Sequence, residues 1–143
     1  MLEIRQENKK DYAEVYNVIK KAFMSAEHCD GNEQDLVVNL RESNNFIPEL
    51  SLAPLAVLPE YQKQGIGKKL IEEGHKKAKK LGYHYSIVLG SERYYPKFGY
   101  VPASKYGIKA PFEALNENFM AIKLNDTDVK ITGVVEYAKE FGI

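Results

Sequence analysis

The chain has 143 residues, enough for one ordinary domain with a buried core and too few for two typical domains. Lys plus Arg and Asp plus Glu both count 20, so no overall charge attracts the chain to nucleic acid or to an anionic membrane. Cys29 is alone, which excludes an intramolecular disulfide and a CxxC metal pair. The polar N-terminal residues and the absence of long apolar runs predict no signal peptide and no membrane span, and we expect a cytoplasmic location.

The N-terminal part of the chain predicts a strand followed by two helices. Residues 2–5 alternate apolar and polar side chains, as a short strand does. Asn8, with Asp11 three residues later, resembles a helix N-cap followed by an acidic N3 residue. Apolar side chains three and four positions apart then predict a helix over about residues 9–22, and a shorter stripe predicts a second helix that ends near residues 43–45.

The middle of the chain predicts a strand, a glycine-containing turn and a long helix. Residues 51–58 are nearly all apolar, as in a strand covered on both faces, but Pro54 cannot donate to a ladder and requires an edge or a bulge. The helix is expected over residues 65–81, with Gly82 as its C′ residue. Strands are then expected over residues 85–89, 119–124 and 129–135, and a short helix over residues 92–98. This order predicts one domain over residues 1–143, of the α/β or α+β class, around a mixed sheet.

The turn before the long helix is suited to a phosphate group. A strand that leads through such a turn into a helix directs several backbone N–H groups and the positive end of the helix dipole at one place. Gly65 and Gly67 lack the Cβ atoms that would hold a ligand away, and Lys63, Lys68 and Lys69 add positive charge. Glycines after a strand also serve ordinary tight turns, so the spacing alone leaves both interpretations open.

Two well-known phosphate loops do not fit this turn. A Walker loop needs glycine where Gln62 stands and Ser or Thr where Lys69 stands. A dinucleotide-binding fingerprint needs a third glycine where Leu70 stands.

The stretch from Leu55 to Leu70 resembles the signature of the GNAT acetyltransferase family. That signature is a strand, then Gln or Arg, two residues, Gly, one residue, and Gly or Ala, and its positions are filled here by Gln62, Gly65 and Gly67. Downstream, residues 95–100 (Tyr-Pro-Lys-Phe-Gly-Tyr) are similar to the family's Tyr-x-x-x-Gly-aromatic segment. Shorter likenesses to an uncharacterised bacterial branch of predicted acetyltransferases extend the resemblance over most of the chain, at residues 22–23, 30–31, 40–43, 48–51 and 55–57.

The resemblance implies the GNAT acyl-CoA N-acyltransferase fold, a mixed and mostly antiparallel sheet flanked by helices. It also implies acetyl-CoA as co-substrate and no metal. The pantetheine arm would contact the backbones of Leu55 and Val57, and Gln62 would belong to the same cofactor site. The pyrophosphate would contact the backbones of Gln64, Gly65, Ile66, Gly67 and Lys68.

The resemblance also suggests catalytic roles. The backbone N–H of Val57 would stabilise the tetrahedral oxyanion, and the hydroxyl of Tyr95 would protonate the departing thiolate as general acid. Alternatively, Tyr94 or Tyr95 simply packs against the sheet. No spacing marks the general base: the residues that can approach the acceptor side in this fold, each also explained as an ordinary solvated charge, are Glu27, His28, Glu33 and Glu49. A nucleophilic role for Cys29 is not favoured, because direct transfer needs no acyl-enzyme.

The sequence departs from the family between Ser51 and Leu52. The family normally has two further strands there, joined by a hairpin, or about twenty to thirty residues judged from usual strand lengths. We favour the interpretation that the printed sequence omits this segment, because loss of central strands would expose much apolar surface.

The expected function is therefore acetyl transfer from acetyl-CoA to a primary amine by direct attack, the amine belonging to a small molecule or to a protein. The alternative is a non-catalytic acyl-CoA-binding or regulatory domain, and an interaction domain ranks third. We expect no nucleic-acid or membrane partner, while a homodimer is compatible with the family's habit.

Overall fold

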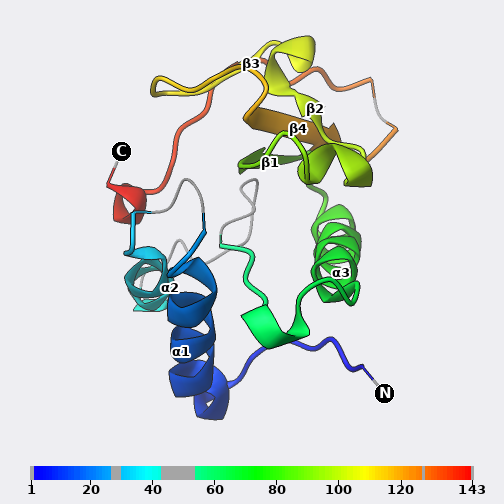
Figure 1. The fold of residues 1–143 in the computed structure, drawn as a ribbon. Helices are drawn as coiled ribbons and strands as arrows, with labels where there is room; N and C mark the ends of the chain where they lie inside the picture. The colour runs from blue at the N-terminus through cyan, green and yellow to red at the C-terminus, as the bar shows by residue number, and fades with distance from the viewer. Residues whose placement is uncertain (1, 27–29, 43–53, 127, 143) are drawn as a thin grey trace. The chain divides into compact units, whose positions relative to one another are not determined.

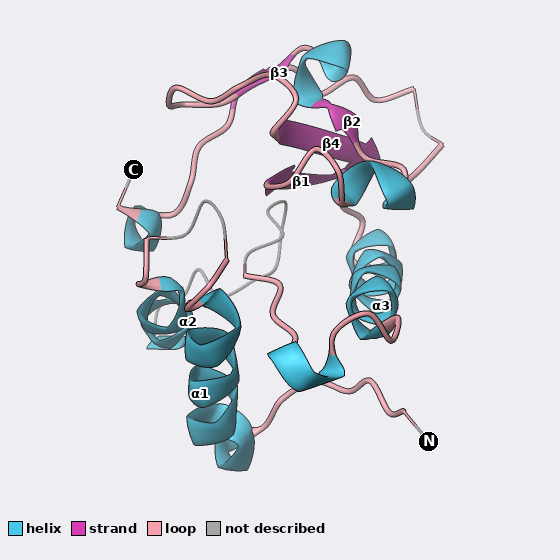
Figure 2. Ribbon diagram, in the orientation of Figure 1, coloured by secondary structure: helices cyan, strands magenta, loops and turns pink. Residues whose placement is uncertain are grey.

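The computed structural model describes residues 2–26, 30–42, 54–126 and 128–142. The chain divides into two compact units, which we call unit 1 (Met1–Ile47 and Pro54–Gly74) and unit 2 (Pro48–Ala53 and His75–Ile143). The chain-order colours of Figure 1 and the element types of Figure 2 show that α1 and α2 come early in the chain, whereas the strands come after α3.

Unit 1 contains the helices α1 (Tyr12–Phe23) and α2 (Glu33–Glu42), which contact each other. The apolar stripes place Ile19 of α1 and Val37 and Leu40 of α2 among the buried residues. The hydroxyl of Tyr16 donates to Asp35 over 3.0 Å, which joins the two helices. Both predicted helices are therefore confirmed.

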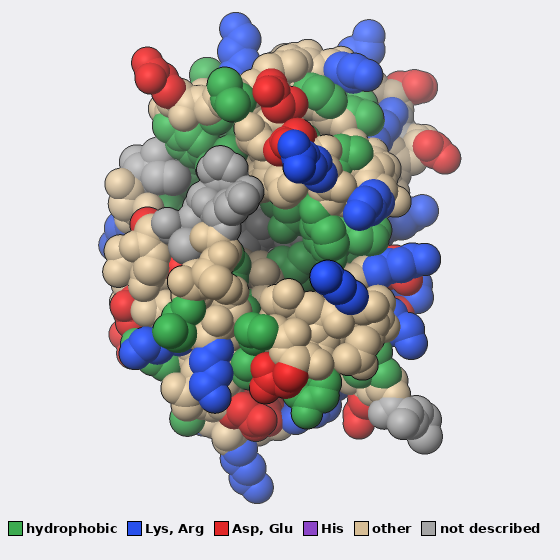
Figure 3. All heavy atoms as spheres, viewed as in Figure 1, with side chains coloured by type: hydrophobic (Ala, Val, Ile, Leu, Met, Phe, Trp, Pro, Cys, Tyr) green, Lys and Arg blue, Asp and Glu red, His purple; other side chains and the backbone are tan. Residues whose placement is uncertain are grey.

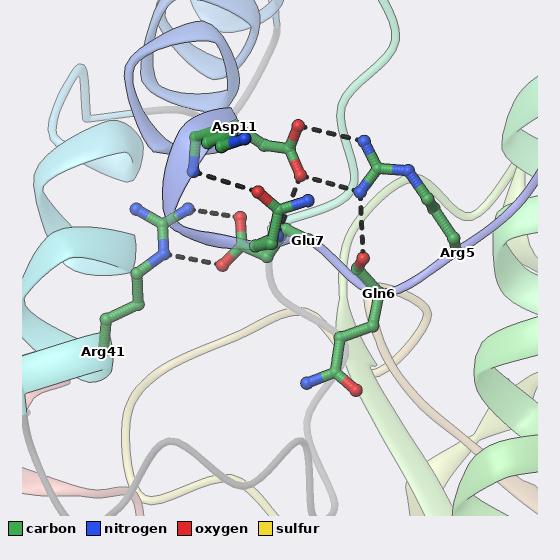
Figure 4. Close-up of polar contacts among 7 residues, drawn as sticks. Arg5, Gln6, Glu7, Asp11 and Arg41 are labelled. Atoms are coloured by element: carbon green, nitrogen blue, oxygen red, sulfur yellow. Dashed lines mark hydrogen bonds and ion pairs between the residues drawn. The ribbon is translucent and has the colours of Figure 1, made fainter.

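The segment before α1 is held by charged side chains instead of the strand predicted at residues 2–5, which is wrong (Figure 4). Arg5 makes two hydrogen bonds to Asp11, of 2.7 and 2.9 Å, and the Asn8 amide also donates to Asp11. Asn8 accepts in turn from the Lys10 amide, which completes the predicted capping box on the 3-10 turn Lys9–Asp11. Because two good partners favour the charged carboxylate, the pKa of Asp11 falls to about 2, with the Arg5 hydrogen bond as the larger cause.

A second ion pair joins this segment to α2. Arg41 donates from Nε and Nη2 to the two carboxylate oxygens of Glu7, over 2.6 and 2.5 Å (Figure 4). Only 9% of the Arg41 side chain is exposed, and its guanidinium carbon lies 4.1 Å from the ring centroid of Tyr12. The bidentate geometry and the stacked ring both suit arginine and would not suit lysine.

The long helix α3 (Ile66–Lys80) follows a 3-10 turn at Pro59–Tyr61, and the boundary between the units falls within it. It ends as predicted at Gly82, whose φ of +89° is a left-handed conformation that glycine adopts without strain. The strand predicted over residues 51–58 is wrong for its described part, because residues 54–58 form no strand. Residues 51–53, and with them the junction between Ser51 and Leu52, lie outside the described residues.

Unit 2 is built on a three-stranded antiparallel sheet in the order β1 (Tyr85–Leu89), β4 (Phe119–Lys123), β2 (Val101–Pro102). Tyr85 pairs with Lys123 and Leu89 with Phe119, so β1 and β4 are matched along their length. A separate parallel pair joins β3 (Ile108–Lys109) to β5 (Gly133–Val134). The predicted strands at residues 85–89 and 119–124 are confirmed, whereas β2 and β3 were not predicted. Of the strand predicted over residues 129–135 only Gly133–Val134 is strand, and of the helix predicted over residues 92–98 only Tyr95–Phe98 is helical, as a 3-10 turn.

The core of unit 2 lies on this sheet. It is a cluster of buried side chains from β1, β3, β4 and the 3-10 turn Ala103–Tyr106: Tyr85, Ile87, Ala103, Ile108, Phe119 and Ala121. Met120 on β4 is also completely buried. Pro102 is tolerated in β2 because this strand is at the edge of the sheet, where a missing N–H costs no ladder bond.

The surface mixes charges of both signs. Figure 3 shows Lys and Arg side chains interspersed with Asp and Glu over the visible face, which agrees with equal totals of 20 basic and 20 acidic residues. In the described part of the chain, no helix has the length and apolar character that crossing a membrane requires.

Candidate functional site

The turn before α3 is closed by two glutamine side chains. The amide nitrogen of Gln62 donates to the backbone carbonyl of Val57 over 3.0 Å, and that of Gln64 donates to the carbonyl of Glu60 over 3.3 Å. Pro59 opens the 3-10 turn between them, where its fixed φ suits a first position. Gln62 thus ties the segment containing Leu55 and Val57 to the entrance of α3.

Two residues of this turn have left-handed backbone, Lys63 with φ of +61° and Gly65 with φ of +82°. Such a φ is strained for a lysine and easy for a glycine. A Cβ atom built at Gly65 would meet no heavy atom within 4 Å. The space beside Gly65 is therefore open, and a ligand could approach the backbone there.

The first turn of α3 offers backbone donors that have no acceptor within the helix. The earliest amide to bond within the helix is that of Lys69, which donates to the Gly65 carbonyl over 3.1 Å. The amides of Ile66, Gly67 and Lys68 precede that bond and have no acceptor within the helix. Together with the helix dipole, they form a site that favours an anion such as a phosphate.

One of the lysines near this turn, Lys68, lies beside a carboxylate. Lys68 lies 3.8 Å from Glu72, one helical turn along α3, and both side chains are more than half exposed. An exposed pair of this kind is weak and screened by salt. The backbone donors are therefore the stronger feature of the site.

In unit 2, Tyr95 begins a 3-10 turn (Tyr95–Phe98) that follows β1 after a short loop. The amides of Tyr94 and Tyr95 both donate to the Ser91 carbonyl, over 3.1 and 3.2 Å. The turn ends at Gly99, whose φ is +96° and whose amide donates to the Pro96 carbonyl. The Tyr-x-x-x-Gly spacing is thus one compact turn with glycine at its left-handed end.

The ring of Tyr95 is packed closely. A Cβ atom added to Gly90 would overlap Cε2 of Tyr95, so the ring lies directly on the backbone at the end of β1. The rings of Tyr94 and Tyr100 contact it edge to face, with centroids 5.2 and 5.6 Å away. Burial among these groups raises the pKa of Tyr95 to about 12, so its hydroxyl keeps its proton throughout the physiological range.

Tyr100 connects this turn to β1 and α3. Its hydroxyl lies 2.7 Å from Oγ of Ser86 on β1 and 2.8 Å from Nε2 of His75 on α3. Its side chain is almost completely buried. Burial lowers the pKa of His75, which favours the neutral imidazole.

Of the four general-base candidates, only Glu33 lies within the described residues; Glu27, His28 and Glu49 lie outside them, as does Cys29. One carboxylate oxygen of Glu33 accepts from the Asp30 amide over 3.0 Å, and the other is buried without a hydrogen-bond partner. In the described ranges, His, Cys, Asp and Glu side chains nowhere gather in threes as a metal site would require.

These features match a known family. The profile of the acetyltransferase (GNAT) domain family covers residues 18–102, more than half of the chain and both of the segments just described. The chain belongs to the GNAT family.

Two curated relatives of this GNAT chain come from Escherichia coli. The uncharacterized N-acetyltransferase YjhQ (strain K12) is 37% identical over 91 residues, which are 61% of this chain and 50% of the relative. The uncharacterized N-acetyltransferase YhbS is 30% identical over 93 residues, which are 64% of this chain and 56% of the relative. The chain thus spans about half the length of the curated relatives that it matches.

Two solved structures share the fold. The crystal structure of YhbS from Escherichia coli, in complex with CoA, has a TM-score of 0.81, covers 97% of this chain and 91% of its own, and is 24% identical. A GNAT acetyltransferase from Brucella melitensis, in complex with acetyl-CoA, has a TM-score of 0.74, covers 96% of each chain and is 25% identical. The predicted GNAT fold, mixed and mostly antiparallel, is therefore confirmed.

The residues predicted for the GNAT site fall in both units. Leu55, Val57 and residues 62–68 lie in unit 1, where Gln62 and Val57 are bonded to each other. Tyr95 lies in unit 2. The left-handed Lys63 and the group formed by Tyr100, Ser86 and His75 were not predicted from the sequence. A tyrosine at the aromatic position of the Tyr-x-x-x-Gly-aromatic segment was a signal for the second, since a buried hydroxyl needs a partner.

Proposed function

We propose that this GNAT domain transfers the acetyl group of acetyl-CoA to a primary amine by direct attack, without an acyl-enzyme. The observation that carries the proposal is the first turn of α3, where three backbone amides without helical acceptors adjoin open space at Gly65. A pyrophosphate needs donors of this kind. The two neighbours crystallised with CoA and with acetyl-CoA support the same choice of ligand.

In the proposed reaction the amine nitrogen attacks the thioester carbonyl carbon, and the electron pair moves onto the oxygen. The backbone N–H of Val57 stabilises this oxyanion. The C–S bond then breaks, and the thiolate of CoA takes the proton of the Tyr95 hydroxyl. A base removes the proton from the amine. Of the four candidate bases, Glu33 is the one that lies within the described residues.

The pKa of about 12 at Tyr95 means that its hydroxyl is protonated near neutral pH and can donate to the departing thiolate. A phenol with this pKa is a weaker acid than a thiol, whose ordinary pKa is about 8.5, so the pKa itself does not favour proton transfer. The tyrosine is a weak acid, so its action is best understood as a hydrogen bond to the departing thiolate that becomes proton transfer as the C–S bond lengthens.

A matched pair of glycines tests the binding half of the proposal. Gly65 and Gly82 stand at opposite ends of α3, with φ of +82° and +89° and no atom near a built Cβ. Aspartate tolerates this φ, so Gly65→Asp places a negative charge at the proposed pyrophosphate site with little strain. We expect calorimetry to show at least ~10-fold weaker acetyl-CoA binding for Gly65→Asp, and unchanged binding for Gly82→Asp. Equal effects of the two changes would reject this phosphate site.

The catalytic half is tested by Tyr95→Phe against Tyr94→Phe. Release of free thiol from acetyl-CoA is followed across a panel of amines. If Tyr95 is the acid, Tyr95→Phe lowers kcat by about 10²- to 10⁴-fold and leaves acetyl-CoA binding unchanged, whereas Tyr94→Phe retains kcat. Binding without turnover on any amine would instead favour the non-catalytic acyl-CoA-binding function.

We also propose that the natural chain carries two further strands between Ser51 and Leu52. Residues 2–5 and 54–58 both have strand-like sequences, yet neither forms a strand. This is expected when the strands that would pair with them are missing, because a strand needs a neighbour for its backbone bonds. The intact mass of the natural protein checks this, and a mass equal to that of the 143-residue chain would refute it.

The acceptor is a small-molecule amine or a protein amino group, the protein acts in the cytoplasm, and a homodimer fits the family. The lone Cys29 is consistent with a reducing compartment.

A further inference from the structure

The ring of Tyr95 is confined on three sides within unit 2. The backbone at Gly90 leaves so little room that a Cβ atom there would overlap Cε2 of the ring and stand 3.0 Å from Cδ2. The ring of Tyr100 meets it at 75° with centroids 5.6 Å apart, and that of Tyr94 at 86° with centroids 5.2 Å apart. A tyrosine so enclosed has little freedom in χ1 and χ2, so its hydroxyl points in one direction.

The Tyr100 ring is itself anchored by its hydroxyl. A phenol has one proton and can accept, so the hydroxyl can donate to one of Ser86 Oγ and His75 Nε2 and accept from the other. Neutral His75 can either accept from the Tyr100 hydroxyl or donate to it, because Nε2 is an acceptor in one tautomer and a donor in the other. The ring of His75 also contacts that of Tyr100, with centroids 5.5 Å apart. Tyr100 is therefore fixed at both its ring and its oxygen.

A phenylalanine at position 100 could fill the same volume without these bonds. The hydroxyl thus fixes the orientation of the Tyr100 ring, which packing of a core residue would not require. The orientation of Tyr100 in turn affects Tyr95, because the two rings are in edge-to-face contact and a shift of one displaces the other.

We infer that Tyr100 and the backbone of Gly90 position the hydroxyl of Tyr95 for proton transfer. Tyr100 is itself held in place by Ser86 and His75. This inference rests on the proposed function, which makes Tyr95 the general acid. Tyr100, Ser86, His75 and Gly90 are positioning residues, since they act through the orientation of Tyr95.

A double-mutant cycle separates positioning from general structural support. A misplaced catalytic group can cost up to about 100-fold in rate, so we expect Tyr100→Phe to lower kcat by about 10- to 100-fold with KM for acetyl-CoA unchanged. In the Tyr95→Phe background the same change should have no further effect, because the hydroxyl that it positions is gone. Equal losses of kcat in both backgrounds would overturn the inference.

Tyr85→Phe is the matched control for loss of a tyrosine hydroxyl. Tyr85 is on β1, is buried like Tyr100 and contacts the ring of Tyr106 edge to face. Its replacement should leave kcat unchanged. A kcat loss like that of Tyr100→Phe would show that any buried tyrosine of the sheet matters equally, which contradicts a specific role for Tyr100.

A measurement without turnover distinguishes failure of this inference from failure of the proposed function. The aromatic ¹³C resonances of Tyr95, assigned by their loss in Tyr95→Phe, report the position of its ring in the free protein. Gly90→Ala and Ser86→Ala should both shift them, the first by direct overlap and the second through Tyr100, and neither depends on whether Tyr100→Phe folds. Unchanged resonances in both variants overturn the inference. Shifted resonances in a protein that transfers no acetyl group support the ring anchoring and reject only the proposed activity.

Discussion

In unit 1 the segment before α1 is joined to the helices by charged side chains, whereas in unit 2 the strands are joined by buried apolar ones. Arg5 with Asp11 and Arg41 with Glu7 form the first set. Ile87, Phe119 and Ala121 belong to the second. A helix satisfies its own backbone hydrogen bonds, whereas a strand needs a neighbouring strand. In unit 2, β1 and β4 pair with each other, while residues 2–5 and 54–58 of unit 1 form no strand.

This contrast bears on the site as well. The turn before α3 depends on local bonds, namely those of the α3 backbone and of the side chains of Gln62 and Gln64. The surroundings of Tyr95 depend on a core assembled from β1, α3 and the turn after them. Substitutions in each unit test this contrast, and hydrogen exchange of backbone amides locates each effect in its unit.

The largest effect is expected in the core of unit 2. Met120 is completely buried on the central strand β4, so Met120→Ala should lower the free energy of unfolding by about 2–5 kcal/mol. Urea titration followed by circular dichroism measures this. Met24→Ala is the control, because 78% of that residue is exposed and its loss should change stability by less than about 0.5 kcal/mol. Similar values for the two variants would contradict a packed core at β4.

The ion pairs of unit 1 should contribute less. Arg41→Ala leaves the carboxylate of Glu7 partly buried without its bidentate partner, which should cost about 2 kcal/mol. The cost should shrink in a Glu7→Gln background, where no charge is left unpaired. Arg93→Ala should change stability very little, since that side chain is 91% exposed beside Glu92. Faster hydrogen exchange in α1 and α2 is the expected local sign, and its absence would show that the pair is not needed there.

Replacing a glycine by alanine should change the free energy of unfolding less, and the sign of the change depends on the backbone conformation of that glycine. Gly99→Ala should cost about 1–2 kcal/mol, because its φ is +96° and its Cβ would lie 3.1 Å from Cδ1 of Ile122. Gly74→Ala, inside α3 with open space around it, should instead stabilise by about 0.5–1 kcal/mol. Thermal unfolding compares the two variants, and changes of the same sign would contradict the assigned conformations.

The smallest effect is a pH dependence in unit 1. The folded pKa of Asp11 is about 2, below its ordinary value of 3.8, so its contribution to stability is complete above about pH 4 and is lost as the pH falls toward 2. Asp11→Asn has no such carboxylate and should lose less stability over this interval. Unfolding temperatures of both proteins at about pH 6, 4 and 2.5 measure the difference. Parallel curves would show that Asp11 titrates normally.

The sequence predicted the parts of the fold that depend on local pattern. The stripe containing Val15 and Ile19 was sufficient for α1, and the short run of mostly apolar residues 85–89 was sufficient for β1. Strand formation at residues 2–5 was predicted wrongly from an alternation of apolar and polar side chains, because pairing depends on distant residues that pattern does not identify. Strands β2 and β3 have two residues each, too short for any period to show.

The candidate site, like the fold, has one part that local sequence suggests and another part that depends on distant residues. Gly65 and Gly67 could be proposed as phosphate contacts from the sequence because the glycine positions of such a turn are close in sequence, and they stay a prediction. The contacts of Tyr100 could not be predicted, since Ser86 and His75 are separated from it by 14 and 25 residues and only the folded core brings them together. Whether a tyrosine in such a segment packs or donates depends on these distant partners.

The bond from Gln62 to the Val57 carbonyl gives a chemical meaning to a position where the family signature accepts Gln or Arg. Both side chains end in an N–H group on a flexible arm, whereas glutamate has the shape of glutamine and carries only acceptors when ionised. The signature can therefore be restated as a requirement for a donor that reaches back five residues. A sequence with Glu at this position would match the signature in size and fail it in chemistry, so searches for distant members should penalise Glu there more than Lys.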